Sequence, residues 1–331
     1  MNRKNSFVCI FIITTLLTTS SVSVLANAST GSIDVISDSF WVWGVGRYRV
    51  TIYYPTDSSE APYPAVIFAH GFLSCMSWHT MIGDYLGSRG YVVLIFTVPD
   101  RYSSNVNQWV NGIEESINYL QFQNNRRHSE LFNMIDLNRI GVIGHSMGGM
   151  ASLIAASNNP DIDTAVVIAA PYLKNLPKTG NEIIDDLLEN IDWDAALTAA
   201  GKIMKPMLFM YGTKDKFMEI DPTKYYDTCP SSNKELVTIE GGNHVGFLDN
   251  IAMQSTLIPL IDLLFDLPLK ILFSLLLNLP SYFEQNNGEA GSLTIIDFAI
   301  KIGIDNPADI TPEVQQEESL EEIVDWFYTF L

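Results

Sequence analysis

A serine between two glycines at fixed spacing is the strongest chemical signal in this sequence. Residues 144–148 read Gly-His-Ser-Met-Gly, a match to Gly-x-Ser-x-Gly with Ser146 at the centre. Aliphatic residues 140–143 before it predict a buried strand, and small residues 147–156 after it predict a helix. In such a turn the glycines let neighbouring backbone approach closely, and the serine hydroxyl stands clear of the sheet edge. The pattern predicts a nucleophilic serine.

The alternative for this stretch is a glycine-rich turn of a nucleotide-binding unit. Dinucleotide sites carry Gly-x-Gly-x-x-Gly at an early strand–helix junction, and phosphate-binding loops carry a lysine after their glycines. In this chain no Gly-x-Gly-x-x-Gly stands at an early strand–helix junction, and no lysine follows the glycines of 144–149. The context therefore favours the nucleophile.

A serine hydroxyl is a poor nucleophile at neutral pH, so it needs a histidine as base and an acid to orient that histidine. With this turn the expected chain order is serine, acid, histidine, each on a loop that leaves a strand. His70 and His79 precede the serine, His128 follows a basic pair on a polar stretch, and His145 is part of the turn. His244, in Gly-Gly-Asn-His after the last predicted strand, is the predicted base.

Asp215 is the predicted acid. It follows the predicted strand 207–211 through Gly-Thr-Lys, on a strand-end loop between Ser146 and His244 in the chain. The alternatives, none of which follows a strand as directly, are Asp192, Asp194 and Asp221.

Acyl transfer also requires two backbone N–H groups that face the developing oxyanion. The residue after the nucleophile, Met147, supplies one. The loop after the predicted strand 65–69 reads His-Gly-Phe-Leu, which makes Phe72 the candidate for the second donor and for an apolar wall beside the substrate. The alternative for this loop is a plain strand-ending turn.

Together these motifs resemble the α/β-hydrolase superfamily, and within it the dienelactone-hydrolase-like group of cutinase-like polyester hydrolases, chlorophyllases and platelet-activating-factor acetylhydrolases. The resemblance implies an α/β-hydrolase fold, a carboxylic ester substrate and no metal or organic cofactor. It also implies substrate contact by Tyr172, whose alternative is a core or rim tyrosine. The stretches that carry the resemblance are 70–72, 142–149, 169–172, 211–215 and 241–244.

This chain departs from that group after its histidine. Bacterial polyester hydrolases usually end soon after it, with a C-terminal disulfide. Here an apolar segment, 251–283, follows instead, and no suitable cysteine pair is present. The resemblance therefore supports the fold and the catalytic residues more strongly than it supports a polyester substrate.

The elements that must position these residues alternate along the chain. Strands are predicted at 33–36, 47–54, 65–69, 91–97, 140–143, 165–169, 207–211 and 235–240. Helices are predicted at 78–88, 108–122, 147–156, 181–189, 193–200, around Tyr225 and at 314–331. Such alternation predicts an α/β fold: a mostly parallel, twisted sheet with helices on both faces, entered through an N-terminal antiparallel hairpin.

The first residues have the character of a targeting segment. A basic start at Arg3 and Lys4, an apolar run at 7–17 and a small-x-small site ending at Ala28 predict a signal peptide over residues 1–28. We expect a secreted or extracytoplasmic protein whose single domain is 29–331. An uncleaved N-terminal anchor is the alternative.

The net charge of the chain argues against two classes of binding partner. The formal net charge is −19, and loss of the basic start makes the remaining chain more acidic still. Such acidity argues against nucleic acid and anionic membrane surfaces as partners. Two cysteines remain, Cys75 and Cys229; the predicted layout puts them at opposite ends of the sheet, so we expect no disulfide between them.

The apolar residues 251–283 do not fit the strand–helix alternation. Three prolines and several charges interrupt them, so they make no clean membrane span. We expect a helical insertion at about 251–290. Extra core helices, a lid over an apolar site, a dimer face and a lipid-contacting patch all remain open.

The predicted function is an exported serine carboxylesterase or lipase. The same residues also serve an amidase, a peptidase or a perhydrolase. A non-enzymatic lipid-binding surface protein is a further alternative, although it leaves the ordered serine, acid and histidine without a purpose.

Overall fold

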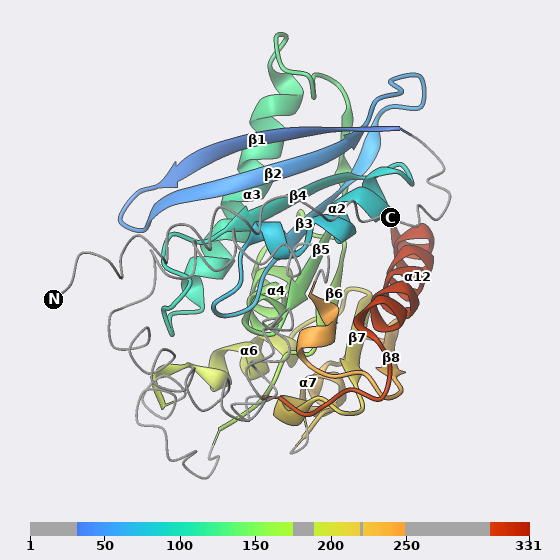
Figure 1. The fold of residues 1–331 in the computed structure, drawn as a ribbon. Helices are drawn as coiled ribbons and strands as arrows, with labels where there is room; N and C mark the ends of the chain where they lie inside the picture. The colour runs from blue at the N-terminus through green and yellow to red at the C-terminus, as the bar shows by residue number, and fades with distance from the viewer. Residues whose placement is uncertain (1–31, 175–188, 219–220, 249–304) are drawn as a thin grey trace, which may run out of the picture. The chain divides into compact units, whose positions relative to one another are not determined.

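One mixed sheet organises the fold (Figure 1). The computed structural model describes residues 32–174, 189–218, 221–248 and 305–331. Within them, eight strands lie in the order β1-β2-β4-β3-β5-β6-β7-β8. The strands are β1 (Ile33–Val42), β2 (Gly46–Pro55), β3 (Tyr63–Ala69), β4 (Val92–Thr97), β5 (Ile135–His145), β6 (Thr164–Ile168), β7 (Met207–Gly212) and β8 (Lys234–Ile239).

Six of these strands pair in parallel, from β4 to β8. The first two form the predicted antiparallel hairpin, and β2 joins the parallel part through an antiparallel pairing with β4. β3 and β4 are buried along their whole length, as expected for parallel strands covered on both faces. The predicted sheet architecture is confirmed.

The largest departures from the predicted strand bounds are in β1 and β5, which are several residues longer than the sequence pattern predicts. β1 continues to Val42, because its pairing with β2 runs without interruption to Gly46. β5 begins at Ile135, which pairs with Tyr63 before the register of the two strands shifts. Neither extension alternates cleanly in hydrophobicity, so the periodicity did not reveal them.

Helices cover both faces of the sheet. The larger hydrophobic cluster lies under α3, α4 and α6, and the second lies under α2 and α12. The helices are α2 (Thr80–Gly87), α3 (Asn107–Asn125), α4 (Met147–Asn158), α6 (Trp193–Ala200), α7 (Lys224–Thr228) and α12 (Pro312–Phe330), with short 3-10 turns at Met76–Trp78, Lys216–Met218 and Val245–Phe247.

The predicted helix 78–88 is wrong in one respect: it is broken at His79. The backbone there has φ −138°, outside the helical range, and separates the 3-10 turn from α2. The ring of His79 is buried and hydrogen-bonds through Nε2 to the Ser74 hydroxyl at 2.9 Å. This local contact is absent from the helical hydrophobic pattern, which is why the break was not predicted.

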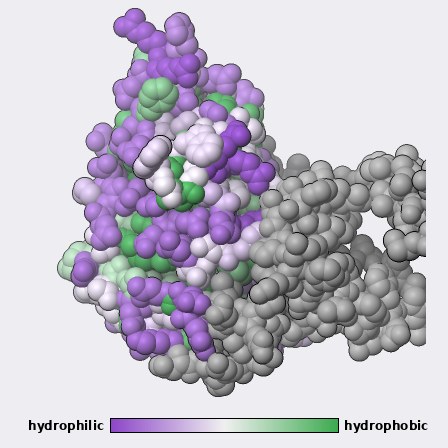
Figure 2. Space-filling view, turned by 90° about the vertical axis from the view of Figure 1, so that its left-hand side faces the viewer, coloured by the Kyte–Doolittle hydropathy of each residue, from purple (hydrophilic) through white to green (hydrophobic). Residues whose placement is uncertain are grey.

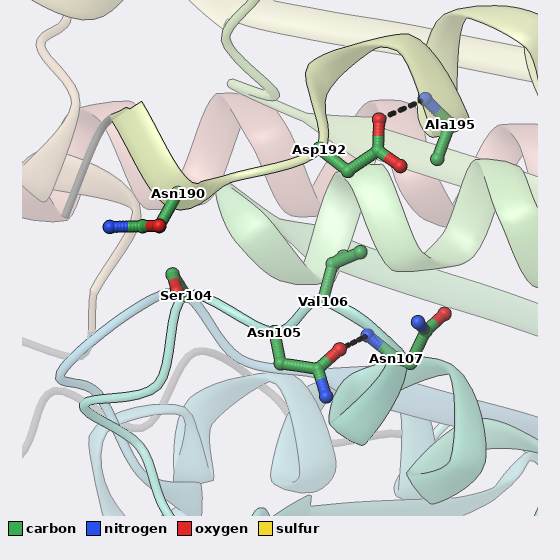
Figure 3. Close-up of a pocket in the computed structure, with 7 residues that line it drawn as sticks. All are labelled: Ser104, Asn105, Val106, Asn107, Asn190, Asp192 and Ala195. Carbon is green, nitrogen blue, oxygen red and sulfur yellow. Dashed lines mark hydrogen bonds between the residues drawn. The ribbon is translucent and has the colours of Figure 1, made fainter.

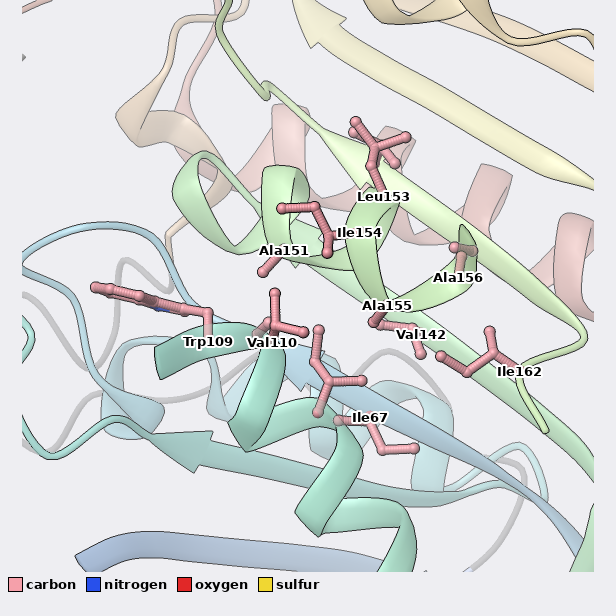
Figure 4. Close-up of a cluster of buried hydrophobic side chains, with 14 of the residues drawn as sticks. Ile67, Trp109, Val110, Val142, Ala151, Leu153, Ile154, Ala155, Ala156 and Ile162 are labelled. Carbon is pink, nitrogen blue, oxygen red and sulfur yellow. The ribbon is translucent and has the colours of Figure 1, made fainter. Parts of the chain in front are cut away.

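Packing between α3, α4 and the sheet forms the larger core (Figure 4). Trp109 and Ile113 of α3 are fully buried, as are Ile67 of β3 and Val142 of β5. Complete burial of such side chains stabilises the fold by roughly 1.5–3 kcal/mol each. This core holds the strand and helix on either side of Ser146.

The C-terminal helix α12 covers the other face of the sheet. Its buried stripe comprises Leu320, Ile323 and Phe327, and the indole Nε1 of Trp326 donates to Thr164 Oγ1 at 2.8 Å. The amphipathic helix predicted for this region is therefore confirmed, and it lies against β6 rather than standing apart.

Several predictions fall outside the described residues: the signal peptide 1–28, the helix 181–189 and the insertion at about 251–290. Residues Gly31–Leu331 cluster as one compact unit. Among the helices that the structure describes, none is long and apolar enough to cross a membrane. Cys75 and Cys229 are buried free thiols.

Candidate active site

Ser146 occupies the sharp turn between β5 and α4. Its backbone has φ 56° and ψ −119°, a conformation that non-glycine residues seldom adopt. Its N–H donates to the carbonyl of Ile168 at the end of β6, at 2.8 Å, which ties the turn to the neighbouring strand. A strained backbone persists only where its surroundings impose it, and such residues cluster at functional sites.

The two glycines of the motif are required by close backbone contacts. A Cβ added at Gly144 would lie 2.1 Å from the carbonyl oxygen of Gly148, and one at Gly148 would lie 2.0 Å from the carbonyl oxygen of Ala69. Both distances are far below van der Waals contact with atoms that cannot swing away. The spacing in the sequence thus reflects the packing of β3, β5 and α4.

His244 and Asp215 lie beside Ser146 in the predicted order. His244 Nε2 is 3.0 Å from Ser146 Oγ, and His244 Nδ1 is 2.8 Å from Asp215 Oδ2. Asp215 follows β7 and His244 follows β8, so both side chains come from loops at the ends of parallel strands. Both residues are buried, which shields their contact from water.

The other acids considered from the sequence lie elsewhere. Asp192 caps α6 by accepting from the Ala195 N–H, and Asp221 pairs with Lys224. Asp194 accepts from the hydroxyl of Tyr172. Each has a local partner, and His244 bonds Asp215 instead.

The environment of His244 favours its charged form. Burial lowers the pKa of His244, but the charge of Asp215, the hydrogen bond that the ring donates to it and the charge of Asp305 outweigh burial and raise that pKa above its ordinary value of 6.5. The nearby His145 has the opposite balance: burial holds its pKa well below the ordinary value. Of these two rings, His244 is the one suited to take up a proton.

Short loops hold Asp215 and His244 in register. The carbonyl of Gly242 accepts from the Lys214 N–H at 2.8 Å, and the Thr213 hydroxyl accepts from the Gly241 N–H at 2.8 Å. A Cβ at Gly212 would lie 2.2 Å from the Gly242 carbonyl oxygen. Gly212 is therefore required by contact between the two loops, whereas a Cβ at Gly242 would meet the Gln315 side chain of α12 at 2.8 Å.

The loop after β3 lies against the serine. A Cβ on Gly71 would lie 3.0 Å from the Cβ of Ser146. Neither the Phe72 nor the Met147 amide has a protein acceptor among the described residues, and Met147 opens α4, where helix N–H groups lack partners. His70 fixes the loop by contacting the Gly71 carbonyl through Nδ1 at 2.6 Å and the Val98 N–H through Nε2 at 3.2 Å.

Tyr172 follows β6, the strand next to the turn. It is half-buried; its hydroxyl donates to Asp194 Oδ1 at 3.0 Å, and its ring meets Tyr225 edge-on with centroids 6.0 Å apart. The Tyr225 hydroxyl in turn donates to the Pro171 carbonyl at 3.1 Å. These contacts hold the ring, which is partly buried and packs against the larger hydrophobic cluster.

Three further side chains support the site and were not predicted from the sequence. His145 contacts the His244 carbonyl through Nε2 at 3.0 Å, Gln315 of α12 is hydrogen-bonded to Asn243, and Asp305 accepts from Val245. Gln315 is a buried polar residue of α12, so the hydrophobic pattern of that helix gives no signal for its role. For Asp305 no sequence pattern exists.

A separate small cavity of about 180 Å³ opens where α3 and α6 begin (Figure 3). Its polar groups serve the helix ends: Asn105 Oδ1 accepts from the Asn107 N–H, and Asp192 accepts from the Ala195 N–H. None of the three side chains centred on Ser146 lines it. We therefore place the candidate site by its chemistry and not by this cavity.

The surface on the side toward which β1 points is mainly hydrophilic, with small hydrophobic areas scattered among polar residues (Figure 2). Wide apolar patches mark interaction sites on soluble proteins, whereas scattered apolar residues are ordinary. Among the residues that the structure describes on this face, there is thus no single wide apolar patch.

A mostly parallel sheet whose serine stands on a strand–helix turn, with acid and histidine on later strand-end loops, defines an α/β hydrolase. This chain therefore has the α/β-hydrolase fold that its motifs imply. Residues 18–179 match the family model described as PET hydrolase-like.

Curated relatives agree with this class. The chain is 35% identical to a bis(hydroxyethyl) terephthalate hydrolase of Streptomyces coelicolor over 136 residues, 40% of each chain. It is 26% identical to cutinase 1 of Thermobifida cellulosilytica over 61% of this chain and 66% of that protein. With cutinase est2 of Thermobifida alba it shares 30% identity over 62% of this chain and 59% of the relative. The chain thus spans between 40% and 66% of the length of these relatives.

Proposed function

We propose that this chain is an exported serine hydrolase that cleaves carboxylic esters through an acyl-enzyme. The observation that carries the proposal is the continuous hydrogen-bonded series from Ser146 Oγ to His244, at 3.0 Å, and from His244 to Asp215, at 2.8 Å. Each link lies within hydrogen-bonding distance, which general base catalysis requires.

In the first half of the reaction, Ser146 Oγ attacks the ester carbonyl carbon while His244 Nε2 takes the hydroxyl proton. Asp215 holds the ring so that Nδ1 carries its own proton, and it stabilises the imidazolium that forms. The imidazolium then donates its proton to the leaving alkoxide, and the alcohol departs. Ser146 is left as an ester of the acyl group.

The second half repeats these steps with water. His244 Nε2 removes a proton from the water, the resulting hydroxide attacks the acyl carbonyl, and Ser146 leaves with the proton returned by the ring. In both halves we assign the Phe72 and Met147 amides to the oxyanion. Loss of one such donor lowers the rate by roughly 10²–10³-fold.

The substrate class is proposed from the relatives. They are named for the hydrolysis of bis(hydroxyethyl) terephthalate, a small aromatic ester, and for cutin, and the family model is named for PET. We therefore propose an apolar or polymeric ester as substrate. We propose that Tyr172, held by Asp194 and Tyr225, and the Phe72 ring contact the substrate beside the catalytic serine.

Hydrolysis of a short p-nitrophenyl ester by the wild-type chain and by Ser146→Ala tests the reaction. The proposal expects turnover by the wild type and its loss in the variant, with a fall of about 10⁴-fold or more and an unchanged circular dichroism spectrum. Full residual activity in the variant would falsify the assignment of Ser146.

A panel of esters, anilides and peroxide run with the same pair of proteins separates an esterase from an amidase, a peptidase or a perhydrolase. Ester turnover that exceeds the other reactions supports the proposal, and preferential anilide cleavage contradicts it.

The role of Tyr172 needs a separate pair of variants. Tyr172→Phe keeps the ring and removes the hydrogen bond to Asp194, whereas Tyr172→Ala removes both. If the ring flanks the substrate, KM for an aromatic ester rises in the alanine variant and stays near the wild-type value in the phenylalanine variant. Equal KM values for all three proteins contradict the assignment.

A further inference from the structure

A second buried carboxylate lies beside the candidate catalytic side chains. Asp305 is 3% exposed. Its Oδ2 accepts from the Val245 N–H at 3.0 Å, and its Oδ1 accepts from the Lys216 N–H at 3.3 Å and from the N–H of Asn306 at 2.8 Å. All three contacts come from N–H donors, which an ionised carboxylate accepts.

Two of these N–H donors belong to residues that directly follow the proposed base and the proposed acid. Val245 directly follows His244, and Lys216 directly follows Asp215. One carboxylate therefore ties the loop of the proposed base to the loop of the proposed acid. Because the distance between His244 and Asp215 depends on these two loops, Asp305 is placed to fix it.

The charges that face His244 come from few groups. Asp215 is bonded to the ring, and Asp305, whose own pKa burial raises above the ordinary value, adds a second negative charge when it is ionised. His145, whose ring centroid is 4.8 Å away, is kept neutral by burial, and the ring of Phe217, at 4.7 Å, carries no charge. The side chains of α12 that hydrogen-bond to the His244 loop are Gln315 and Gln316, and both are uncharged. Asp305 is thus the second anion that an imidazolium at His244 would meet.

We propose that Asp305 is a positioning residue of this hydrolase: it holds the Asp215 and His244 loops in register and stabilises the imidazolium formed during each half-reaction. The inference rests on the proposed function. It adds a second carboxylate, supplied by the C-terminal part of the chain, to the serine, histidine and acid assigned above.

The test compares wild type, Asp305→Asn and Asp309→Asn, with Ser146→Ala as the inactive reference. Asparagine removes the charge of Asp305 and replaces one acceptor by an amide nitrogen. We expect kcat to fall about 10- to 100-fold, as for loss of hydrogen bonds to a charged group, with little change in KM. We also expect the acid limb of the kcat/KM profile to move to lower pH, because a lost negative charge makes His244 easier to deprotonate.

Asp309→Asn is the matched control. Asp309 lies four residues later in the same segment and also carries a negative charge, but its side chain is 64% exposed and pairs with Lys214 on the surface. The proposal expects wild-type kcat and an unshifted acid limb for this variant. A merely structural role of Asp305 would lower thermal stability or the active fraction and leave the acid limb in place; that result overturns the proposal.

If Asp305→Asn does not fold, Asp305→Glu is measured in its place. Glutamate keeps the charge and moves the carboxylate by one methylene, so we expect a lower kcat with the acid limb where the wild type has it. An unchanged kcat overturns the positioning role. If the wild type shows no ester turnover that depends on Ser146, the proposed function fails, and this outcome is distinct from wild-type behaviour in the Asp305 variants.

Discussion

Gln315 and Asn243 exchange two hydrogen bonds across 72 positions of sequence. Gln315 Oε1 accepts from the Asn243 N–H at 3.0 Å, and Gln315 Nε2 donates to the Asn243 carbonyl at 2.7 Å. Asn243 precedes His244, and Gln315 is fully buried on α12. The C-terminal helix thus satisfies the backbone of the loop that presents the proposed base.

Replacement of Gln315 by leucine tests this support. Leucine fills similar space but leaves the Asn243 N–H and carbonyl buried without a partner, and each unsatisfied group costs about 1–3 kcal/mol. We expect the free energy of unfolding in urea to fall by about 2–4 kcal/mol and kcat to fall with it. Glu318→Leu, on the exposed side of the same helix, should leave both near wild type; equal stability of the two variants contradicts this role for Gln315.

The pH dependence of activity should follow His244. The base must be neutral to accept the serine proton, and its pKa is raised above 6.5. Activity is therefore expected to fall as the pH drops through a value above 6.5. Asp215→Asn removes the main source of that shift, so the acid limb should move to lower pH while kcat falls by about 10⁴-fold. Asp221→Asn, at the surface, is the control, and an unmoved limb in Asp215→Asn contradicts the assignment.

Stability should respond to pH through His70. Burial lowers the pKa of this ring from 6.5 to about 4. Between these values the unfolded chain binds a proton at His70 that the folded chain does not, so this ring alone lowers the free energy of unfolding by roughly 3 kcal/mol at most as the pH falls from 6.5 to 4. The buried rings of His79 and His145, whose pKa values burial also lowers, add to the decline. Urea unfolding at a series of pH values measures this. The decline should be weaker in His70→Gln and unchanged in His128→Gln, where the ring is exposed; identical profiles in all three would rule out His70 as the source.

Gly148, the second glycine of the Gly-x-Ser-x-Gly motif, should tolerate no side chain. In Gly148→Ala the added Cβ would meet the Ala69 carbonyl at 2.0 Å, which forces the turn or β3 to move. We expect a loss of about 1–3 kcal/mol in unfolding free energy and a large loss of activity. Gly201→Ala makes only ordinary contacts, the nearest at 3.5 Å, and should behave as wild type. Full activity in Gly148→Ala would show that the packing of this turn does not matter.

The sheet and the proposed catalytic residues could be predicted because they rest on local patterns. Buried parallel strands are continuous apolar runs, and Ser146, Asp215 and His244 each sit directly after one. Chain order then selects among the histidines. The contacts that support them arise between distant segments: Asp305 and Gln315 contact the His244 loop although at least 60 positions of sequence separate them from it, and no periodicity encodes such a pairing. The motif indicates only that His145 is part of the turn. Its hydrogen bond to the His244 carbonyl joins residues 99 positions apart, so no local pattern predicts it.

Covalent labelling of the intact protein with a fluorophosphonate, followed by peptide mapping by mass spectrometry, tests the assignment of Ser146 as the nucleophile most directly. An activated serine forms one adduct, whereas ordinary serines do not react. We expect a single adduct on the peptide that contains Ser146, loss of ester hydrolysis in proportion to labelling, and no adduct in Ser146→Ala. An unlabelled wild-type protein, or an adduct on another residue, would contradict this assignment.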